Sequence, residues 1–269
     1  TDLSLLEQKY NQIVGAMTCD FKGEARTLPQ MARFLEDQDR ASRECAWRSI
    51  TERRLEAKEA LDALFDEMIE KRTKIARNAG YDNFRDYQHD AMHRYDYSPV
   101  DCVNFQNAIE EVVVPLRRRL DEERKSELGL DRLFPWDTAV DTKGRDPLRP
   151  FANADELVDR SSRLFHKMDA QLGGIFDTLR EGDCLDLETR QGKAPGGYQY
   201  NRDFSRKPFI FMNAAGLHRD LETVVHEAGH AFHSCLADHD PLVSYRHPPI
   251  EFAEVASMSM ELLTRPYLA

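Results

Sequence analysis

Two histidines and a glutamate form the pattern in this chain that is best suited to chemistry. His226, Glu227 and His230 stand in the order H-E-x-x-H within an expected helix. Residues four apart share one helical face, with Cβ atoms about 5–6 Å apart, so both imidazoles can bind one zinc ion. The glutamate then lies beside the open coordination position, where it can take a proton from a zinc-activated water. The spacing therefore predicts the hydrolytic site of a zinc peptidase.

The sequence around this motif has the period of a half-buried helix. Apolar residues recur at spacings of three and four, namely Leu221, Val224, Val225, Ala228 and Phe232. The two histidines flank this stripe, so we expect them to be half-buried. Gly229 lies in the middle, where a glycine costs about 0.8–1 kcal/mol relative to alanine. Its presence favours the close approach of another segment.

A second helical pattern, at residues 250–263, offers a third ligand. It follows two prolines and carries Glu251, Glu254 and Glu261 on a helix that is otherwise mostly apolar. A glutamate from a following helix is the third zinc ligand in enzymes of the thermolysin type. We expect Glu254, in the middle of the helix, to be this ligand and Glu251 to be solvated.

Glu222 precedes His226 by four residues and shares its helical face. Metal-binding histidines commonly donate their other ring N–H to a carboxylate, which fixes the tautomer. Glu222 is placed for this role. A surface glutamate near the start of the helix explains the same spacing equally well.

Two segments match a known family most specifically: H-E-A-G-H-A-F-H-S at 226–234, and F-A-E-V-A-S at 252–257. Other matching segments are 27–30, 79–81, 128–130, 135–137, 196–198 and 208–213. With these motifs the chain resembles the thimet oligopeptidase and oligoendopeptidase F family of zinc metallopeptidases, and it is most similar to the oligoendopeptidase F side. The resemblance implies that His226, His230 and Glu254 bind one zinc ion per chain and that Glu227 is the general base.

The resemblance also implies a fold and an activity. The implied fold is mainly α, a zincin-type helical metallopeptidase of neurolysin-like architecture, with a small β-sheet beside the active-site helix. The implied activity is the hydrolysis of internal bonds in short oligopeptides, which reach the site through a deep channel that excludes folded proteins. Glu222 and Glu261 would support the ligands.

Two further residues are candidates for contact with the substrate. His233 lies on the ligand face, and Tyr198 precedes the expected strand at 208–212. A metzincin would need glycine at 233 and histidine at 236, where this chain has His233 and Leu236, so that class is excluded. The exposed edge of a strand before the zinc helix can hold a peptide by main-chain hydrogen bonds.

Members of the family extend beyond the third-ligand helix, into a segment whose histidine and tyrosines stabilise the oxyanion. This chain ends at Ala269. We therefore expect an internal piece of a larger peptidase, in which the neurolysin-like architecture is incomplete.

Composition bounds the remaining possibilities. The chain has 269 residues, of which 41% are hydrophobic and 32% charged, and its formal net charge is −11. This charge disfavours nucleic acids and anionic membranes as partners, and it does not identify a substrate. Short peptides are the partners that the resemblance implies. No apolar run approaches the 18 residues of a membrane span. The five cysteines are widely spaced and contain no C-x-x-C, which favours a reduced, cytoplasmic protein. Nothing indicates an oligomeric state.

The pattern along the chain predicts two regions. Residues 1–185 are expected to form a mostly helical wall, with a β-hairpin near residues 11–28 and a possible kink at Pro115. Residues 133–150 are the most linker-like segment, and Asn153 is expected to cap a helix that reaches residue 181. Residues 186–269 are expected to form the zinc-binding catalytic core, without the C-terminal part of that domain.

Two other classes of protein remain to be weighed. A helical di-iron carboxylate protein is one, because Glu227 and His230 also form an E-x-x-H, but such bundles need a second E-x-x-H. None occurs elsewhere, and the segments ending at His89 and His93 are weak substitutes. The other is a non-catalytic zinc- or peptide-binding module. Metal analysis separates the first from a peptidase, and a peptidase assay separates the second.

Overall fold

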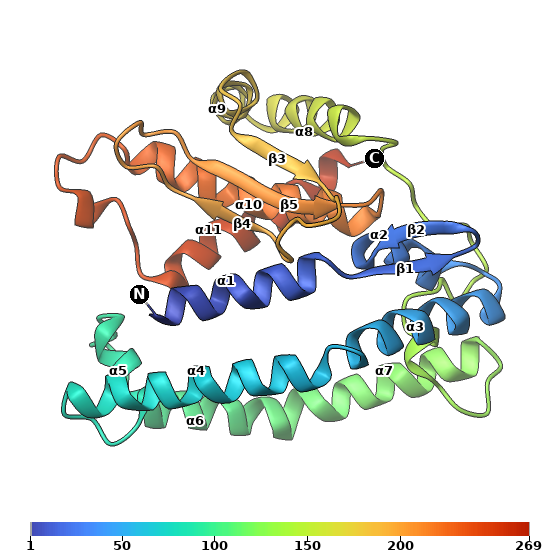
Figure 1. The fold of residues 1–269 in the computed structure, drawn as a ribbon. Helices are drawn as coiled ribbons and strands as arrows, with labels where there is room; N and C mark the ends of the chain where they lie inside the picture. The colour runs from blue at the N-terminus through green and yellow to red at the C-terminus, as the bar shows by residue number, and fades with distance from the viewer. Residues whose placement is uncertain (1, 269) are drawn as a thin grey trace. The chain divides into compact units, whose positions relative to one another are not determined.

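Helices dominate the computed structural model, which describes residues 2–268 and confirms the expected mainly α class (Figure 1). The chain divides into two compact units. The first unit comprises residues up to 13, residues 17–26 and residues 34–147, and the second comprises residues 14–16, 27–33 and those from 148 onward. The boundary falls inside the segment that the sequence marks as linker-like, some 40 residues before the expected start of the catalytic core at 186.

The first unit is built from long helices and a hairpin. Its elements are α1 (Asp2–Gly15), β1 (Thr18–Phe21), β2 (Glu24–Thr27), η1 (Arg33–Glu36), α3 (Arg40–Leu55), α4 (Lys58–Asn78), α5 (Phe84–Ala91), α6 (Pro99–Ala108), η2 (Ile109–Val113), α7 (Val114–Glu127) and η3 (Pro135–Asp137). Some elements extend by a residue or two into the second unit.

The expected hairpin is present, with shorter strands than the sequence predicts. Its turn residues Lys22 and Gly23 both have positive φ, at 53° and 82°, as a two-residue type I′ turn requires. Residues 11–15, expected to be part of the hairpin, belong instead to α1. Leu6 of α1 is buried against Leu64 and Met68 of α4, and this tertiary contact favours continuing the helix over extending a strand.

The expected kink near Pro115 takes the form of a π-helical turn. The turn, η2, ends two residues before the proline and joins α6 to α7. A proline lacks the N–H for the normal helical hydrogen bond and its ring crowds the preceding turn, so a local change of helix type accommodates it.

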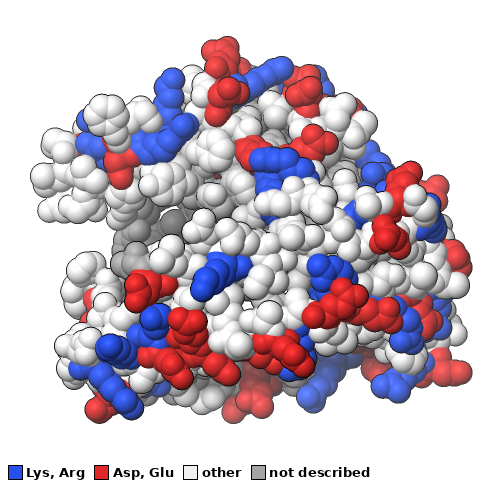
Figure 2. Space-filling view, viewed as in Figure 1, with Lys and Arg blue, Asp and Glu red and all other residues white. Residues whose placement is uncertain are grey.

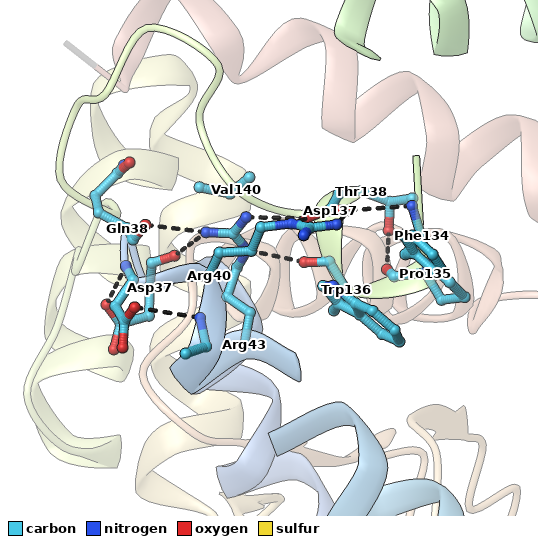
Figure 3. Close-up of polar contacts among 12 residues, drawn as sticks. Asp37, Gln38, Arg40, Arg43, Phe134, Pro135, Trp136, Asp137, Thr138 and Val140 are labelled. Carbon is cyan, nitrogen blue, oxygen red and sulfur yellow. Dashed lines mark hydrogen bonds and ion pairs between the residues drawn. The ribbon is translucent and has the colours of Figure 1, made fainter. Parts of the chain in front are cut away.

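A buried charge cluster joins the start of α3 to η3 (Figure 3). The Asp137 carboxylate is fully buried and accepts hydrogen bonds from Arg40 Nε at 2.9 Å and from one Arg43 terminal nitrogen at 3.0 Å. The other Arg43 nitrogens donate to the carbonyl oxygens of Trp136, Asp37 and Gln38 at 2.9–3.1 Å. A buried ion pair is stable only when its remaining polar atoms are also bonded, and this cluster meets that condition.

The second unit places a three-stranded sheet beside the helix that carries the H-E-x-x-H motif (Figure 1). Its elements are α2 (Leu28–Ala32), α8 (Ala154–Met168), α9 (Ala170–Glu181), β3 (Leu185–Glu188), β4 (Tyr198–Tyr200), β5 (Phe209–Ala214), α10 (His218–Ala237), η4 (Val243–Tyr245), α11 (Ile250–Leu263) and η5 (Arg265–Tyr267). The strand order is β3-β5-β4, with β3 parallel and β4 antiparallel to β5. The strand expected at 208–212 is therefore the central strand β5, which is paired on both sides, so the exposed edge expected there is wrong and β4 is an edge strand instead.

One hydrophobic core explains why the second unit begins near residue 148. Phe165 and Phe176, from α8 and α9, are packed in the same core as Ile210 of β5 and Val224 of α10. The helices that the sequence places in the wall region therefore contribute to the core beneath the motif. Asn153 caps α8 as expected, by accepting from the Glu156 amide. The expected long helix to residue 181 breaks at Asp169, whose carboxylate caps α9.

The close approach expected at Gly229 is confirmed. A Cβ at this position would lie 2.7 Å from the Cα of Ser257 and 3.0 Å from the Ala256 carbonyl oxygen, both in α11. Ser257 and Met260 are the buried residues of α11, whereas Phe252 and Val255 are exposed in the structure. The face of α11 that lies on α10 at Gly229 thus carries Ala256, Ser257 and Met260.

The surface carries both signs of charge, interspersed over the face shown in Figure 2. Many pairs are of the i,i+4 type on helices, such as Arg117 with Asp121 and Arg160 with Glu156. Such pairs stabilise isolated helices by about 0.2–0.5 kcal/mol each. None of the helices described here combines the length and apolar character needed to cross a membrane.

Candidate metal centre and catalytic site

The three expected zinc ligands, His226, His230 and Glu254, converge between α10 and α11. His226 Nε2 lies 3.3 Å from one carboxylate oxygen of Glu254, and His230 Nε2 lies 3.8 Å from the other. The candidate ligand atoms of all three residues lie within 4.8 Å of one another. The helical spacing of the histidines and the contact at Gly229 together produce this arrangement, because they place Glu254 opposite both rings.

A second carboxylate from α11 orients the first histidine. His226 Nδ1 is 2.7 Å from Glu261 Oε1, which leaves Nε2 directed at Glu254. This is the carboxylate–histidine contact that fixes the ring tautomer of metal ligands. Glu222 does not join the group, because its carboxylate faces His218 at 3.8 Å. Its helical spacing from His226 is right, but tertiary packing brings Glu261 to the ring instead.

The start of α10 is held by a buried aspartate. Asp220 Oδ2 accepts hydrogen bonds from the amides of Ala215, Gly216 and Leu217 at 2.7–2.9 Å. Burial raises the pKa of Asp220, although these three amides partly oppose the effect. The loop after β5 is therefore tied to the helix that carries the histidines, which fixes the motif relative to the sheet.

Glu227 is the most deeply buried carboxylate of the site, with 6% of its surface exposed. Burial raises its pKa to about 7, with Glu254 contributing in the same direction, while His226 and the backbone amide of Gln199 lower it. A cation held beside the carboxylate would favour its ionised form and lower this pKa. A carboxylate whose pKa lies near neutrality is suited to take up and release a proton.

The surroundings of His230 favour its neutral form. Burial lowers the pKa of His230, and the nearby Glu254 carboxylate and a hydrogen bond to the Ala253 backbone act against the decrease. Neutral imidazole is the form that binds metal ions.

The charges of the site are not balanced by the protein. Glu227, Glu254 and Glu261 lie around two histidines, and none of the three forms an ion pair with any lysine or arginine in residues 2–268. Crowded carboxylates without a cation repel one another. A bound divalent cation would remove this repulsion.

The donor set fits zinc in particular. Zinc takes nitrogen and oxygen ligands at about 2.0–2.2 Å, so neighbouring ligands of a tetrahedral site stand about 3.3–3.5 Å apart. The separations of 3.3 and 3.8 Å between Glu254 and the histidines are close to that edge length. Two histidines and one glutamate leave a fourth position free, as in catalytic zinc sites.

The two candidate substrate residues lie in different surroundings. His233 is half-buried on α10. It is close enough to His230 to contribute to the lowered pKa of His230. Tyr198 stacks on Phe211 of β5, with ring centroids 4.8 Å apart, and is 47% exposed. Side chains alternate across a strand, so the side chains of Tyr198 and Gln199 lie on opposite faces of β4. The side-chain nitrogen Nε2 of Gln199 lies 3.4 Å from the Ser234 hydroxyl of α10.

Two contacts of the site are not anticipated by the sequence analysis. Ser257 donates to Glu254 Oε2 at 3.1 Å and so fixes the carboxylate of the third ligand. The Gln199 amide contacts Glu227, as described above. The i,i+3 spacing of Glu254 and Ser257 signals the first contact, whereas nothing local signals the second, because it depends on where β4 lies.

The sheet with its edge strand, the motif helix and the following carboxylate-bearing helix together define the class. The fold is that of a mainly α, zincin-like metallopeptidase. The family model of peptidase family M3 matches residues 33–269. The chain belongs to this family.

Relatives with known names agree with this assignment. Oligoendopeptidase F from Lactococcus lactis subsp. cremoris is 36% identical over 162 residues, which cover 58% of this chain and 25% of the relative. Oligopeptidase PepF from Bacillus subtilis is 30% identical over 159 residues, covering 58% of this chain and 23% of the relative. The chain thus spans about a quarter of the length of these curated relatives.

Solved structures match nearly the whole chain. A putative oligoendopeptidase F from Bacillus anthracis has 31% identity and a TM-score of 0.93, covering 99% of this chain and 49% of that structure. The structure titled PZ peptidase A with inhibitor 2 has 30% identity and a TM-score of 0.94, covering 99% of this chain and 47% of that one. About half of each solved protein therefore has its counterpart here.

Proposed function

We propose that the native protein carrying this sequence is a zinc-dependent endopeptidase that hydrolyses internal bonds of short oligopeptides. The observation that carries the proposal is the convergence of His226 Nε2 and His230 Nε2 on Glu254, with the buried Glu227 carboxylate alongside. The named relatives are oligoendopeptidases and oligopeptidases, which supports peptides as the substrate class.

His226, His230 and Glu254 would hold the zinc ion, and Glu261 would keep the first imidazole in its binding orientation. Zinc supplies Lewis acidity when bound, which polarises a scissile carbonyl and lowers the pKa of water. Ser257 limits the rotation of the Glu254 carboxylate through its hydrogen bond. The ligands are thus pre-positioned by contacts that they make with the protein itself.

Glu227 would act as the general base and then as the general acid. Its carboxylate accepts a proton from the attacking water and returns it to the amine that leaves when the peptide bond breaks. Its burial excludes bulk water, and the contact with the Gln199 amide holds the carboxylate toward β4.

The free edge of β4 would bind the peptide. Among the described strands, β4 pairs only with β5, so its other edge has unpaired main-chain groups. Added strands bind such an edge through main-chain hydrogen bonds that do not depend on side-chain identity. This mode of binding supports a broad range of peptide sequences.

The five cysteines are free in the structure. Free thiols are compatible with a reducing compartment, and we include a cytoplasmic location in the proposal. Short peptides remain the proposed partners. A di-iron function has less support, because His226, His230 and Glu254 are the one group of potential metal ligands found in residues 2–268.

Glu227→Gln tests the proposal in the native full-length protein. The amide keeps the shape of the side chain but accepts no proton, so cleavage of a quenched-fluorescent peptide should fall by about 10²–10⁴. Zinc content, measured by elemental analysis, should stay near one per chain. Glu222→Gln is the matched control, because it makes the same change on the same helix at an exposed residue.

Two results would contradict the proposal in different ways. Near-normal cleavage by Glu227→Gln would remove this residue from the chemistry. A zinc-loaded wild-type protein that binds peptides without cleaving them would show a binding module in place of an enzyme.

A further inference from the structure

The loop between β3 and β4 has little regular structure, yet buried polar contacts anchor it. Residues 189–197 connect β3, at one edge of the sheet, to β4, at the other edge. The Gly192 amide donates to the Gly15 carbonyl at 2.8 Å, and the Lys193 amide donates to the Arg190 carbonyl at 3.2 Å. A loop held in this way can determine where the following strand lies.

Lys193 is the main anchor and an unusual one, because its side chain is only 1% exposed. The ammonium donates to the carbonyl oxygens of Asp186 and Glu188 at 2.9 and 2.8 Å and to Asp186 Oδ1 at 2.9 Å. An ammonium has three N–H groups, so its hydrogen-bonding capacity is fully used. Burying a lysine costs free energy unless it is paired, and here the partners are the backbone and side chain of β3.

The same ammonium reaches across the sheet toward the edge strand. It lies 4.5 Å from the centroid of the Phe211 ring, and Phe211 in turn stacks on Tyr198 at 4.8 Å with an interplanar angle of 14°. Asp186, Phe211 and Tyr198 are register partners across β3, β5 and β4. A continuous column therefore links the buried cation to the first residue of β4.

Asn213 holds the second half of the loop. Its side-chain amide donates to the carbonyl oxygens of Ala194 and Gly196, both at 2.9 Å. Gly197 follows directly, and a Cβ there would lie 3.4 Å from Met212 and Thr223. The chain thus enters β4 beside residues of both β5 and α10.

We propose that Lys193 and Asn213 are positioning residues that hold the free edge of β4 against α10 for peptide binding. The link to the motif helix is Gln199, the middle residue of β4, whose side-chain nitrogen lies 3.4 Å from the Ser234 hydroxyl of α10. Neither Lys193 nor Asn213 touches the metal ligands or Glu227 in the contacts described. The inference rests on the proposed peptidase function and adds the residues that set its binding edge.

Lys193→Met tests this role, since it keeps an unbranched side chain one atom shorter than lysine and removes the three N–H donors. In the native full-length protein we expect KM for a short peptide to rise roughly tenfold, the scale of one or two lost main-chain hydrogen bonds. We expect kcat and zinc content to change little, because uniform binding is lost while the reacting groups remain. Hydrogen exchange of the amides at 197–200 should become faster.

Arg190→Met is the matched control. Arg190 pairs with the same Asp186 carboxylate at 2.7 and 2.9 Å, but its side chain is 59% exposed. The Arg190→Met variant should have a KM and amide exchange rates at 197–200 near those of the wild type. Asn213→Leu gives a second route to the same phenotype, through an independent contact, if Lys193→Met does not fold.

The outcomes separate positioning from stability and from failure of the proposed function. If kcat falls in proportion to the folded fraction while KM stays unchanged, Lys193 is structural only and the proposal is overturned. Unchanged KM together with unchanged exchange at 197–200 overturns it as well. If the zinc-loaded wild type cleaves no peptide, the peptidase function fails, and the exchange comparison still decides whether Lys193 holds β4.

Discussion

The clusters around Asp137 and Glu254 both contain carboxylates, but they differ in whether positively charged side chains neutralise those carboxylates. Around Asp137, one fully buried carboxylate meets two guanidinium groups and a backbone amide, and its hydrogen bonds are satisfied within the protein. Around Glu254, three carboxylates lie near two imidazoles, without an ion pair to any described lysine or arginine. The first group is neutralised by described residues, whereas the second has carboxylates that no described lysine or arginine neutralises.

The difference distinguishes a structural charge cluster from a functional one. Arg43 and Asp137 are almost without exposure, so their pairing contributes to the specific docking of the segment after α7 onto α3. Glu254 and Glu261 are each more than a third exposed, which leaves the site open to water and ligands. Clustered carboxylates that no described lysine or arginine neutralises are typical of a metal-binding site.

The largest effect is expected from removing a ligand imidazole. His226→Ala or His230→Ala should reduce zinc from one per chain to almost none under mild chelation, because two ligands no longer define the site. Zinc at 100 times its dissociation constant should stabilise the wild type by about 2.7 kcal/mol and the variants hardly at all. His166→Ala, at an exposed histidine of α8, serves as the control. Full zinc in both ligand variants would place the metal elsewhere.

In the metal-free protein, substitutions in the two clusters should have different effects on the free energy of unfolding. Asp137→Asn should destabilise it by about 3–5 kcal/mol, since a buried Arg43 loses its counter-charge. Glu254→Gln should leave metal-free stability within about 0.5 kcal/mol of the wild type, because no cation loses its partner. Urea unfolding in the presence of a chelator measures both. Equal destabilisation by the two substitutions would contradict the distinction between the clusters.

The smallest effect concerns acid. Burial favours a raised pKa for Asp137, but hydrogen bonds from Arg40, the Phe134 amide and Arg43 outweigh it and hold the pKa below its ordinary value. Its contribution to stability should therefore be complete above the unfolded-state pKa of about 3.9 and be lost as the pH falls through the lower folded-state value.

Urea unfolding of wild type and Asp137→Asn at a series of pH values checks this expectation. The stability difference should be constant between pH 7 and 5 and should shrink below pH 4. A difference that stays constant down to pH 3 would mean that the aspartate does not act through its charge.

Local patterns predicted the elements that carry the site. The stripe formed by Leu221, Val224, Val225, Ala228 and Phe232 is buried as its period indicates. The glycine within it is the point of contact with α11, and the turn at Lys22 and Gly23 forms the expected hairpin. These features follow from neighbours a few residues apart, so no long-range information is needed.

Long-range packing decided what local patterns left open. Both Glu222 and Glu261 are expected to support the ligands, but the docking of α11 brings only Glu261 to the His226 ring, while Glu222 faces His218. The same docking turned the polar side of α11 toward α10, and the shared core of α8, α9, β5 and α10 moved the boundary between the units to residue 148.

The sequence by itself determined the helical spacing of His226 and His230, the adjacent Glu227 and the supply of carboxylates on the next helix. These depend only on the 3.6-residue period and on the chemistry of the side chains. The tertiary structure alone decided which carboxylate meets which imidazole, how deeply Glu227 is buried and where the edge of β4 lies. The reason is that distances between elements depend on the packing of residues far apart in the chain, such as Gly229 against Ser257 and Lys193 against Asp186.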